Sequence, residues 1–152
     1  IKPNGLLIGI DKDMEILQIA KQHISEIGNI FKLYHADYSE IDEVLRQAGT
    51  DKVNGVLLDL GTSSMQFDQA DRGFSFSKEG PLDMRMDRSQ GITAKDLIHR
   101  LSEQKLEELF SKYGEERWSR RIARAILKEP EIEKKGALFE GCQDQDQEEK
   151  NQ

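Results

Sequence analysis

Three acidic side chains follow short apolar runs in the first 60 residues, and each has the chemistry to bind a ligand. Asp11 closes the run LLIGI, Asp37 comes shortly after IFKLYH, and Asp59 ends VNGVLL. An ionised carboxylate accepts hydrogen bonds on both oxygens, so an acid such as Asp11 at the end of a nucleotide-binding strand suits two ribose hydroxyls. An acid that ends an apolar run, as Asp59 does, is costly unless it faces solvent or a ligand. The structural alternatives are that Asp11 or Asp13 caps a helix and that Asp59 bonds nearby turn amides.

The pattern of apolar residues predicts that each acid follows a strand of one sheet. Residues at helical spacing separate the first two runs, with Asp13 as the cap and Gly28 as the end of this helix. A second helix is predicted to be capped by Ser39 and to run through Ala48, with Gly49 as its stop. This order predicts an α/β fold with a parallel sheet, at whose carboxyl edge the acids would line one crevice. The predicted strands are Leu6 to Ile10, Ile30 to His35 and Val53 to Leu58.

The pattern changes after Gly61 and becomes helical again near residue 93. Residues 63–91 are rich in Gly, Asp, Ser, Met and Phe without a clear period, and an irregular loop of this length usually has a function. The predicted helices beyond it are Ala94 to Arg100, Glu103 to Tyr113 and Glu115 to Lys128, with Thr93 and Ser102 as caps and Gly114 and Pro130 as stops.

The last predicted helix carries charges of a single sign. Its bases fall on one helical face, and no acid occurs between residues 117 and 128. A solvated face usually interleaves both signs, so this stripe favours phosphate contact over simple solvation. The stripe consists of Arg117, Arg121, Arg124 and Lys128, with Arg120 beside it and with Trp118, Ile122, Ala125 and Ile126 on a neighbouring face.

The length of 152 residues suffices for one ordinary domain or two small ones. No apolar run approaches the roughly 20 residues of a membrane helix, and no signal peptide is recognisable, so a cytoplasmic protein without membrane contact is expected. The net charge of −7 argues against a uniformly basic nucleic-acid binder, but residues 129–152 alone carry eight acids and three bases. The single cysteine, Cys142, excludes an internal disulfide, and the scattered histidines predict no metal site.

Three segments together carry a resemblance to a known family. LLDLGTSSMQFDQADRGFSF, GPLDMRMD and YGEERWSRRIARAI resemble the ribosomal RNA small subunit methyltransferase H (MraW) family, over about Leu6 to Lys128. The resemblance implies S-adenosylmethionine as cofactor and the N4 amino group of a cytidine in small-subunit (16S) rRNA as target. It also implies a partial Rossmann-like class I methyltransferase sheet followed by an α-helical insertion domain. The implied partner is the small-subunit rRNA or the ribosomal subunit, and a homodimer is left open.

The resemblance also implies roles for individual residues. Asp11 would hold the cofactor ribose, and Tyr38, where the family more often has Phe, would pack beside the adenine. Asp59 and Gln66 would complete the pocket, and Asp59 is the candidate to accept a hydrogen bond or proton from the target amine. The candidates for RNA contact are Arg85 and Arg88, unless Arg85 pairs with Asp83 or Asp87, and Phe74 and Phe76, which would stack on a base or pack in the core.

The chain departs from the family at both ends. The Gly-rich, GGHS-like cofactor loop would lie before Ile1, and the chain begins without Met, so we expect a piece of a longer protein. Residues 1–64 are expected to form a partial cofactor domain, 65–128 the active-site segment and helical substrate domain, and 129–152 a disordered acidic tail. The alternative to a methyltransferase is a non-catalytic remnant that binds RNA or protein through the helix at 117–128. A nicotinamide-dependent dehydrogenase would also use an acid like Asp11, but it gives no reason for DLGTSSMQ.

Overall fold

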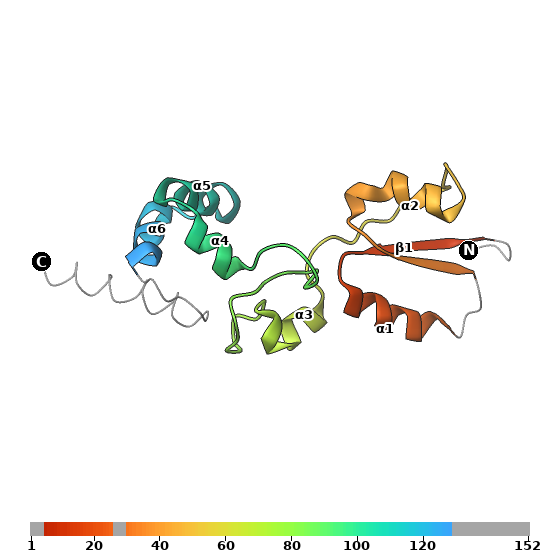
Figure 1. The fold of residues 1–152 in the computed structure, drawn as a ribbon, viewed down its shortest axis with the longest axis horizontal. Helices are drawn as coiled ribbons and strands as arrows, with labels where there is room; N and C mark the ends of the chain where they lie inside the picture. Colours follow the sequence, from red (N-terminus) through yellow and green to blue (C-terminus); the bar gives the residue numbers. More distant parts are fainter. Residues whose placement is uncertain (1–4, 26–29, 129–152) are drawn as a thin grey trace, which may run out of the picture. The chain divides into compact units, whose positions relative to one another are not determined.

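Two parallel strands form the sheet of the amino-terminal half (Figure 1). The computed structural model describes residues 5–25 and 30–128. Strand β1 (Leu7–Asp11) pairs with β2 (Phe31–His35), with Gly9 opposite Leu33 in the register. A Cβ at position 9 would lie 2.7 Å from Leu33 Cδ2, so the glycine lets the leucine pack across the strand. The first two of the three predicted strands are thereby confirmed within one residue at each end.

Two helices lie on opposite sides of these strands (Figure 1). Asp13 caps α1 (Met14–Ile24) as predicted, whereas the predicted stop at Gly28 lies outside the described residues. Helix α2 (Ile41–Ala48) ends at Gly49, which has a φ of 86°. A short 3-10 turn, η2 (Tyr38–Glu40), precedes it. The predicted cap at Ser39 is wrong, because the Asp37 carboxylate accepts from Ser39 N and forms a capping box with Glu40.

The predicted third strand, Val53 to Leu58, does not form. No strand is present among residues 53–60, and their side chains are all exposed, with Leu57 at 93%. A strand exists only through hydrogen bonds to a neighbour, and within the described residues the sheet consists of β1 and β2 alone. The apolar run has the composition of a strand, but composition does not show whether a neighbouring strand is present to pair with it.

The carboxyl-terminal half is helical. Thr93 and Ser102 cap α4 (Ala94–Arg100) and α5 (Glu103–Gly114), as predicted. The last helix begins four residues later than predicted, because Glu115 takes a left-handed conformation with a φ of 51°. The elements of this half are α3 (Ser64–Asp68), the 3-10 turn η3 (Ala70–Arg72), α4, α5 and α6 (Ser119–Lys128), and its core contains Leu82, Leu106, Ala123 and Ile126.

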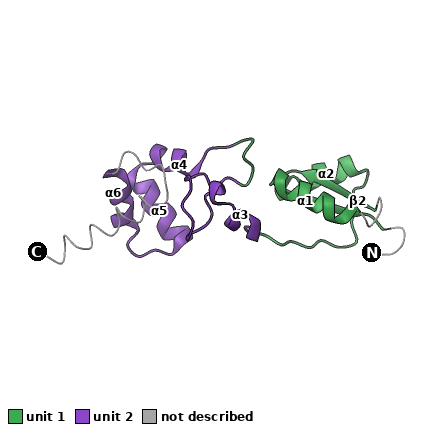
Figure 2. Ribbon diagram, turned by 90° about the horizontal axis from the view of Figure 1, so that it is seen from below, with its two compact units in different colours: residues 1–60, 86–90 green, residues 61–85, 91–152 purple. Residues whose placement is uncertain are grey.

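The chain divides into two compact units (Figure 2). Unit 1 comprises residues 1–60 and 86–90, and unit 2 comprises residues 61–85 and 91–152. Residues 86–90 therefore belong with the strands, although the residues on both sides of them belong with the helices. None of the described helices has the length and apolar composition needed to cross a membrane. The predicted disordered tail at 129–152 lies outside the described residues.

Candidate functional site

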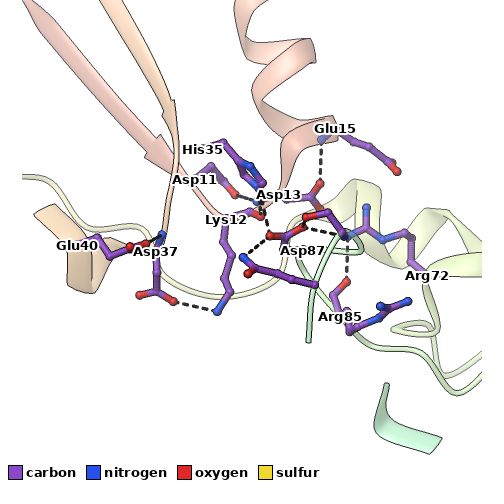
Figure 3. A network of polar contacts seen from close by, with 12 residues as sticks. Asp11, Lys12, Asp13, Glu15, His35, Asp37, Glu40, Arg72, Arg85 and Asp87 are labelled. Carbon is purple, nitrogen blue, oxygen red and sulfur yellow. Dashed lines mark hydrogen bonds and ion pairs between the residues drawn. The ribbon is translucent and has the colours of Figure 1, made fainter. Parts of the chain in front are cut away.

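Asp11 ends β1, and its carboxylate is fixed by a hydrogen bond to one of its two oxygens. Its Oδ1 accepts a hydrogen bond from Asp13 N at 2.7 Å, and its carbonyl accepts from Ala36 N at 3.1 Å. Asp13 Oδ1 accepts from Glu15 N, so the helix cap is Asp13 (Figure 3). Asp11 Oδ2 makes no hydrogen bond within the described part of the chain. This geometry leaves Asp11 able to accept a hydroxyl from a ligand.

The end of β2 carries a second carboxylate and an exposed ring. Asp37 accepts a hydrogen bond from Lys12 Nζ at 2.9 Å (Figure 3). It also accepts from the amide and the hydroxyl of Ser39. These bonds, with the Ser39 amide as the largest cause, hold the pKa of the Asp37 carboxyl well below its ordinary value. The hydrogen bond to the Asp37 carboxylate raises the pKa of Lys12. The neighbouring Tyr38 is 58% exposed, so its ring is accessible to a ligand.

A contact that the sequence did not predict fixes residues 86–90 to the end of β2 (Figure 3). His35 Nε2 lies 3.0 Å from Lys12 O and 3.4 Å from Asp87 Oδ2. Asp87 is buried and accepts from Ser89 N, Ser89 Oγ and Gln90 Nε2 at 2.9, 2.6 and 2.6 Å. The hydrogen bond from the Ser89 hydroxyl is the main reason that the pKa of Asp87 is lowered. Part of the PLDMRMD motif therefore belongs structurally to the carboxyl ends of the strands.

Asp59 and Gln66 differ sharply in their surroundings. Asp59 is exposed and makes no hydrogen bond within the described residues. Gln66 is 3% exposed, and its Oε1 accepts from Ser63 N at 3.0 Å in the capping box of α3. Asp59 belongs to unit 1, as do Asp11 and Tyr38, whereas Gln66 belongs to unit 2. The structure therefore brings together the predicted residues at the ends of β1 and β2, and Gln66 has a structural role in its own unit.

The irregular segment between α3 and α4 is a packed loop. The buried Arg72 donates from Nη2 to Arg85 O at 3.2 Å (Figure 3), and its carbonyl accepts from Met84 N. A Cβ at Gly80 would lie 2.0 Å from Ala70 O, so the backbone passes there without room for a side chain. The RGFSF and GPLDM motifs therefore hold each other in position.

The predicted RNA contacts in this loop have different environments. Arg85 forms a bidentate pair with Asp83, with Nε to Oδ1 at 2.8 Å and Nη2 to Oδ2 at 2.9 Å. This is one of the two pairings considered as the alternative to a phosphate contact. Arg88 is exposed, Phe76 is 86% exposed and Phe74 is partly buried. A stacking role is thus more accessible to Phe76 than to Phe74, and both roles stay predictions.

The basic residues of α6 contact an acid of α5 and the ring of Trp118. Arg124 Nε lies 2.8 Å from Glu103 Oε1, and Arg120 Nε lies 3.6 Å from the same oxygen. The guanidinium groups of Arg117 and Arg121 lie over the ring of Trp118. The prediction from the stripe counted acids within the helix alone, whereas Glu103 comes from α5. Lys128 is exposed at the end of the helix.

A parallel strand–helix–strand unit with carboxylates at its strand ends occurs in nucleotide-binding α/β domains. Within the described residues, no group of three or more His, Cys, Asp or Glu side chains is placed to hold a metal ion. The model of the MraW methylase family matches residues 2–143, and the chain belongs to this family.

Curated relatives agree with this assignment. The chain is 46% identical over 126 residues to the ribosomal RNA small subunit methyltransferase H of Geobacter sp. (strain M21). The aligned residues cover 83% of the chain and 40% of the relative. The proteins of the same name from Pelobacter propionicus and Sorangium cellulosum are 48% and 49% identical over 124 residues, or 82% of the chain. These matches cover 40% and 39% of the two relatives. The chain thus spans about two fifths of the length of the curated relatives it matches.

Proposed function

We propose that the chain is part of an S-adenosylmethionine-dependent methyltransferase that modifies the N4 amino group of a cytidine in small-subunit rRNA in the cytoplasm. The observation that carries the proposal is the Asp11 carboxylate, fixed at the end of β1 with Oδ2 available, in a member of the MraW methylase family. In this proposal unit 1 is part of a Rossmann-like class I cofactor domain and unit 2 is part of the helical domain inserted into it.

The residues of unit 1 fit the nucleoside half of S-adenosylmethionine. Asp11 has a free carboxylate oxygen for a ribose hydroxyl, and the exposed ring of Tyr38 follows the next strand and suits an adenine face. When bound, S-adenosylmethionine supplies an activated methyl group on a sulfonium. Gln66 would contribute only if its amide reached the cofactor while its oxygen stayed on Ser63 N.

Asp59 is the residue that we assign to the target amine. The lone pair of an exocyclic cytosine amine is delocalised into the ring, so the amine must be held in line and must give up a hydrogen. A carboxylate without partners in the described chain can accept that hydrogen bond or proton. Its exposed position on a segment of small and apolar residues leaves the carboxylate accessible to a base.

The RNA would be held mainly by unit 2. We assign phosphate contact first to Arg117 and Lys128, whose side chains are exposed, together with Arg121 of the same stripe. Arg85 and Arg124 would contribute less, because their guanidinium groups already lie on Asp83 and Glu103. Arg88 and Phe76 are exposed and suit a phosphate and a base.

The alternative function is a non-catalytic module that binds RNA or protein through the basic residues around α6. The exposed basic residues of α6 support this alternative, because they could bind a phosphate or an acidic surface without a cofactor or a target amine. Transfer of a labelled methyl group from S-adenosylmethionine to small ribosomal subunits separates the two. We expect Asp59→Asn to lower the transfer rate by about a hundredfold or more, whereas Asp51→Asn, an exposed acid of the same unit, leaves it unchanged. Transfer by Asp59→Asn at the wild-type rate would remove Asp59 from the mechanism.

A further inference from the structure

An exposed tryptophan lies beside two arginines at the start of α6, and the proposed function so far gives it no role. Trp118 is 53% exposed. The guanidinium carbon of Arg117 lies 5.1 Å from the centre of the Trp118 ring, and that of Arg121 lies 6.0 Å from it. Such a ring offers one ligand both a stacking surface and two positive charges.

The backbone that carries this ring is fixed. Trp118 N donates to Glu116 Oε1 at 2.9 Å, and Trp118 O accepts from Ile122 N at 3.0 Å. The left-handed Glu115 sets the turn before it. An exposed ring on an ordered backbone loses little conformational freedom when it binds, so the position is preorganised for a ligand.

The core does not need this ring. The buried residues of α6 include Ser119, Ala123 and Ile126, and the last two belong to the core cluster of unit 2. A second exposed ring stands at the other side of the turn, where Lys112 Nζ lies 5.1 Å from the centre of Tyr113. Two rings with cations thus flank the turn between α5 and α6, outside the core.

We propose that Trp118 is a stacking platform for an unpaired base of the RNA, with Arg117 and Arg121 contacting the phosphates of the same strand. The inference rests on the proposed function, which makes the substrate an RNA with an accessible base. Single-stranded RNA alternates flat bases with phosphates, which matches an exposed ring with two cations beside it in shape and charge. Duplex RNA hides its base faces, so it would use the arginines without the ring.

Trp118 is the only tryptophan of the chain, so its fluorescence reports stacking directly. The chain is titrated with a short single-stranded RNA, with the duplex of the same sequence, and with heparin, which has negative charge and no bases. We expect the single strand to quench the fluorescence of Trp118, and the duplex and heparin to bind with little quenching.

Variants then separate the ring from the charges. By the anisotropy of a labelled single-stranded RNA, Trp118→Leu should weaken binding by about fivefold to a hundredfold, and Trp118→Phe should retain most of it. Arg117→Gln should weaken binding to RNA and to heparin alike. Arg46→Gln, an exposed arginine of α2, is the matched charge control and should change neither. Circular dichroism checks that each variant is folded.

Three results would overturn the platform: equal quenching by heparin, wild-type affinity in Trp118→Leu, or no binding of single-stranded RNA. The last would leave the surface to a protein partner. The proposed function fails by a different result, because a chain that binds RNA through Trp118 but does not bind S-adenosylmethionine would keep the platform and lose the methyltransferase.

Discussion

Replacing Gly73 with alanine tests whether the segment between α3 and α4 is a packed loop. Gly73 has a φ of 79°, a left-handed conformation in which alanine costs about 1–2 kcal/mol. A Cβ there would also lie 2.5 Å from Pro81 O and 3.0 Å from Asp83 N. Both are backbone atoms that cannot rotate away, so the loop must shift, and overpacking of this kind adds about 1–3 kcal/mol. The expected loss for Gly73→Ala is therefore about 2–5 kcal/mol.

Gly91 provides a matched control. Its φ is also 79°, but a Cβ would meet nothing within 4 Å. Gly91→Ala therefore carries the conformational cost without the clash. The difference between the two variants in free energy of unfolding, about 1–3 kcal/mol, isolates the contact of Gly73 with Pro81 and Asp83.

Urea unfolding followed by Trp118 fluorescence measures this difference, because the single tryptophan lies in unit 2 with both glycines. With a urea slope of about 1–3 kcal/mol per molar, the two midpoints should differ by on the order of 1 M. Equal midpoints for Gly73→Ala and Gly91→Ala would refute the packed loop, since they would mean that the added methyl group meets no backbone.

Two further predictions concern carboxylates. Asp87→Ala removes the acceptor of Ser89 and Gln90, so trypsin should cleave native chain after Arg88 faster than in the control Asp51→Ala; an unchanged rate would contradict the anchoring of residues 86–90. The hydrogen bond from the Thr93 hydroxyl is the main cause of the lowered pKa of Asp96. The charged carboxyl therefore stabilises the folded state above about pH 4, the ordinary pKa of Asp. This stabilisation is lost as the pH falls through the lower pKa of the folded state. Thr93→Val should flatten this acid-dependent loss in urea unfolding, and an unaltered pH profile would count against the capping box.

Local signals in the sequence predicted local structure well. Asp13, Thr93 and Ser102 each bond an amide two or three residues away, so the caps could be recognised without knowledge of the rest of the fold. The strand at 53–58 depends on a partner that composition does not encode, and it does not form. The start of α6 was misplaced because a non-glycine residue, Glu115, takes the left-handed conformation that patterns assign to glycine.

The residues of the candidate site that depend on local sequence signals were predicted, and those that depend on contacts between distant segments were not. Asp11 follows directly from its place at the end of an apolar run, and Asp13, two residues on, was already a candidate for the cap. The contact between His35 and Asp87 joins residues far apart in the sequence without any periodic signal, so only the structure reveals it. The acids that face Arg120 and Arg124 belong to α5, which an analysis of one helix at a time could not find.

Calorimetric titration with S-adenosylmethionine tests the central claim most directly. In Asp11→Asn, Oδ1 stays available to Asp13 N, but the second oxygen is replaced by an amide NH2, which cannot accept a hydrogen bond from a ribose hydroxyl. Loss of a hydrogen bond to a charged group costs about 1.5–3 kcal/mol, so Asp11→Asn should bind about tenfold to a hundredfold more weakly. Asp51→Asn should bind as the wild type does. Equal affinity of Asp11→Asn and wild type, or no binding by the wild type, would contradict the assignment of this strand end to the cofactor.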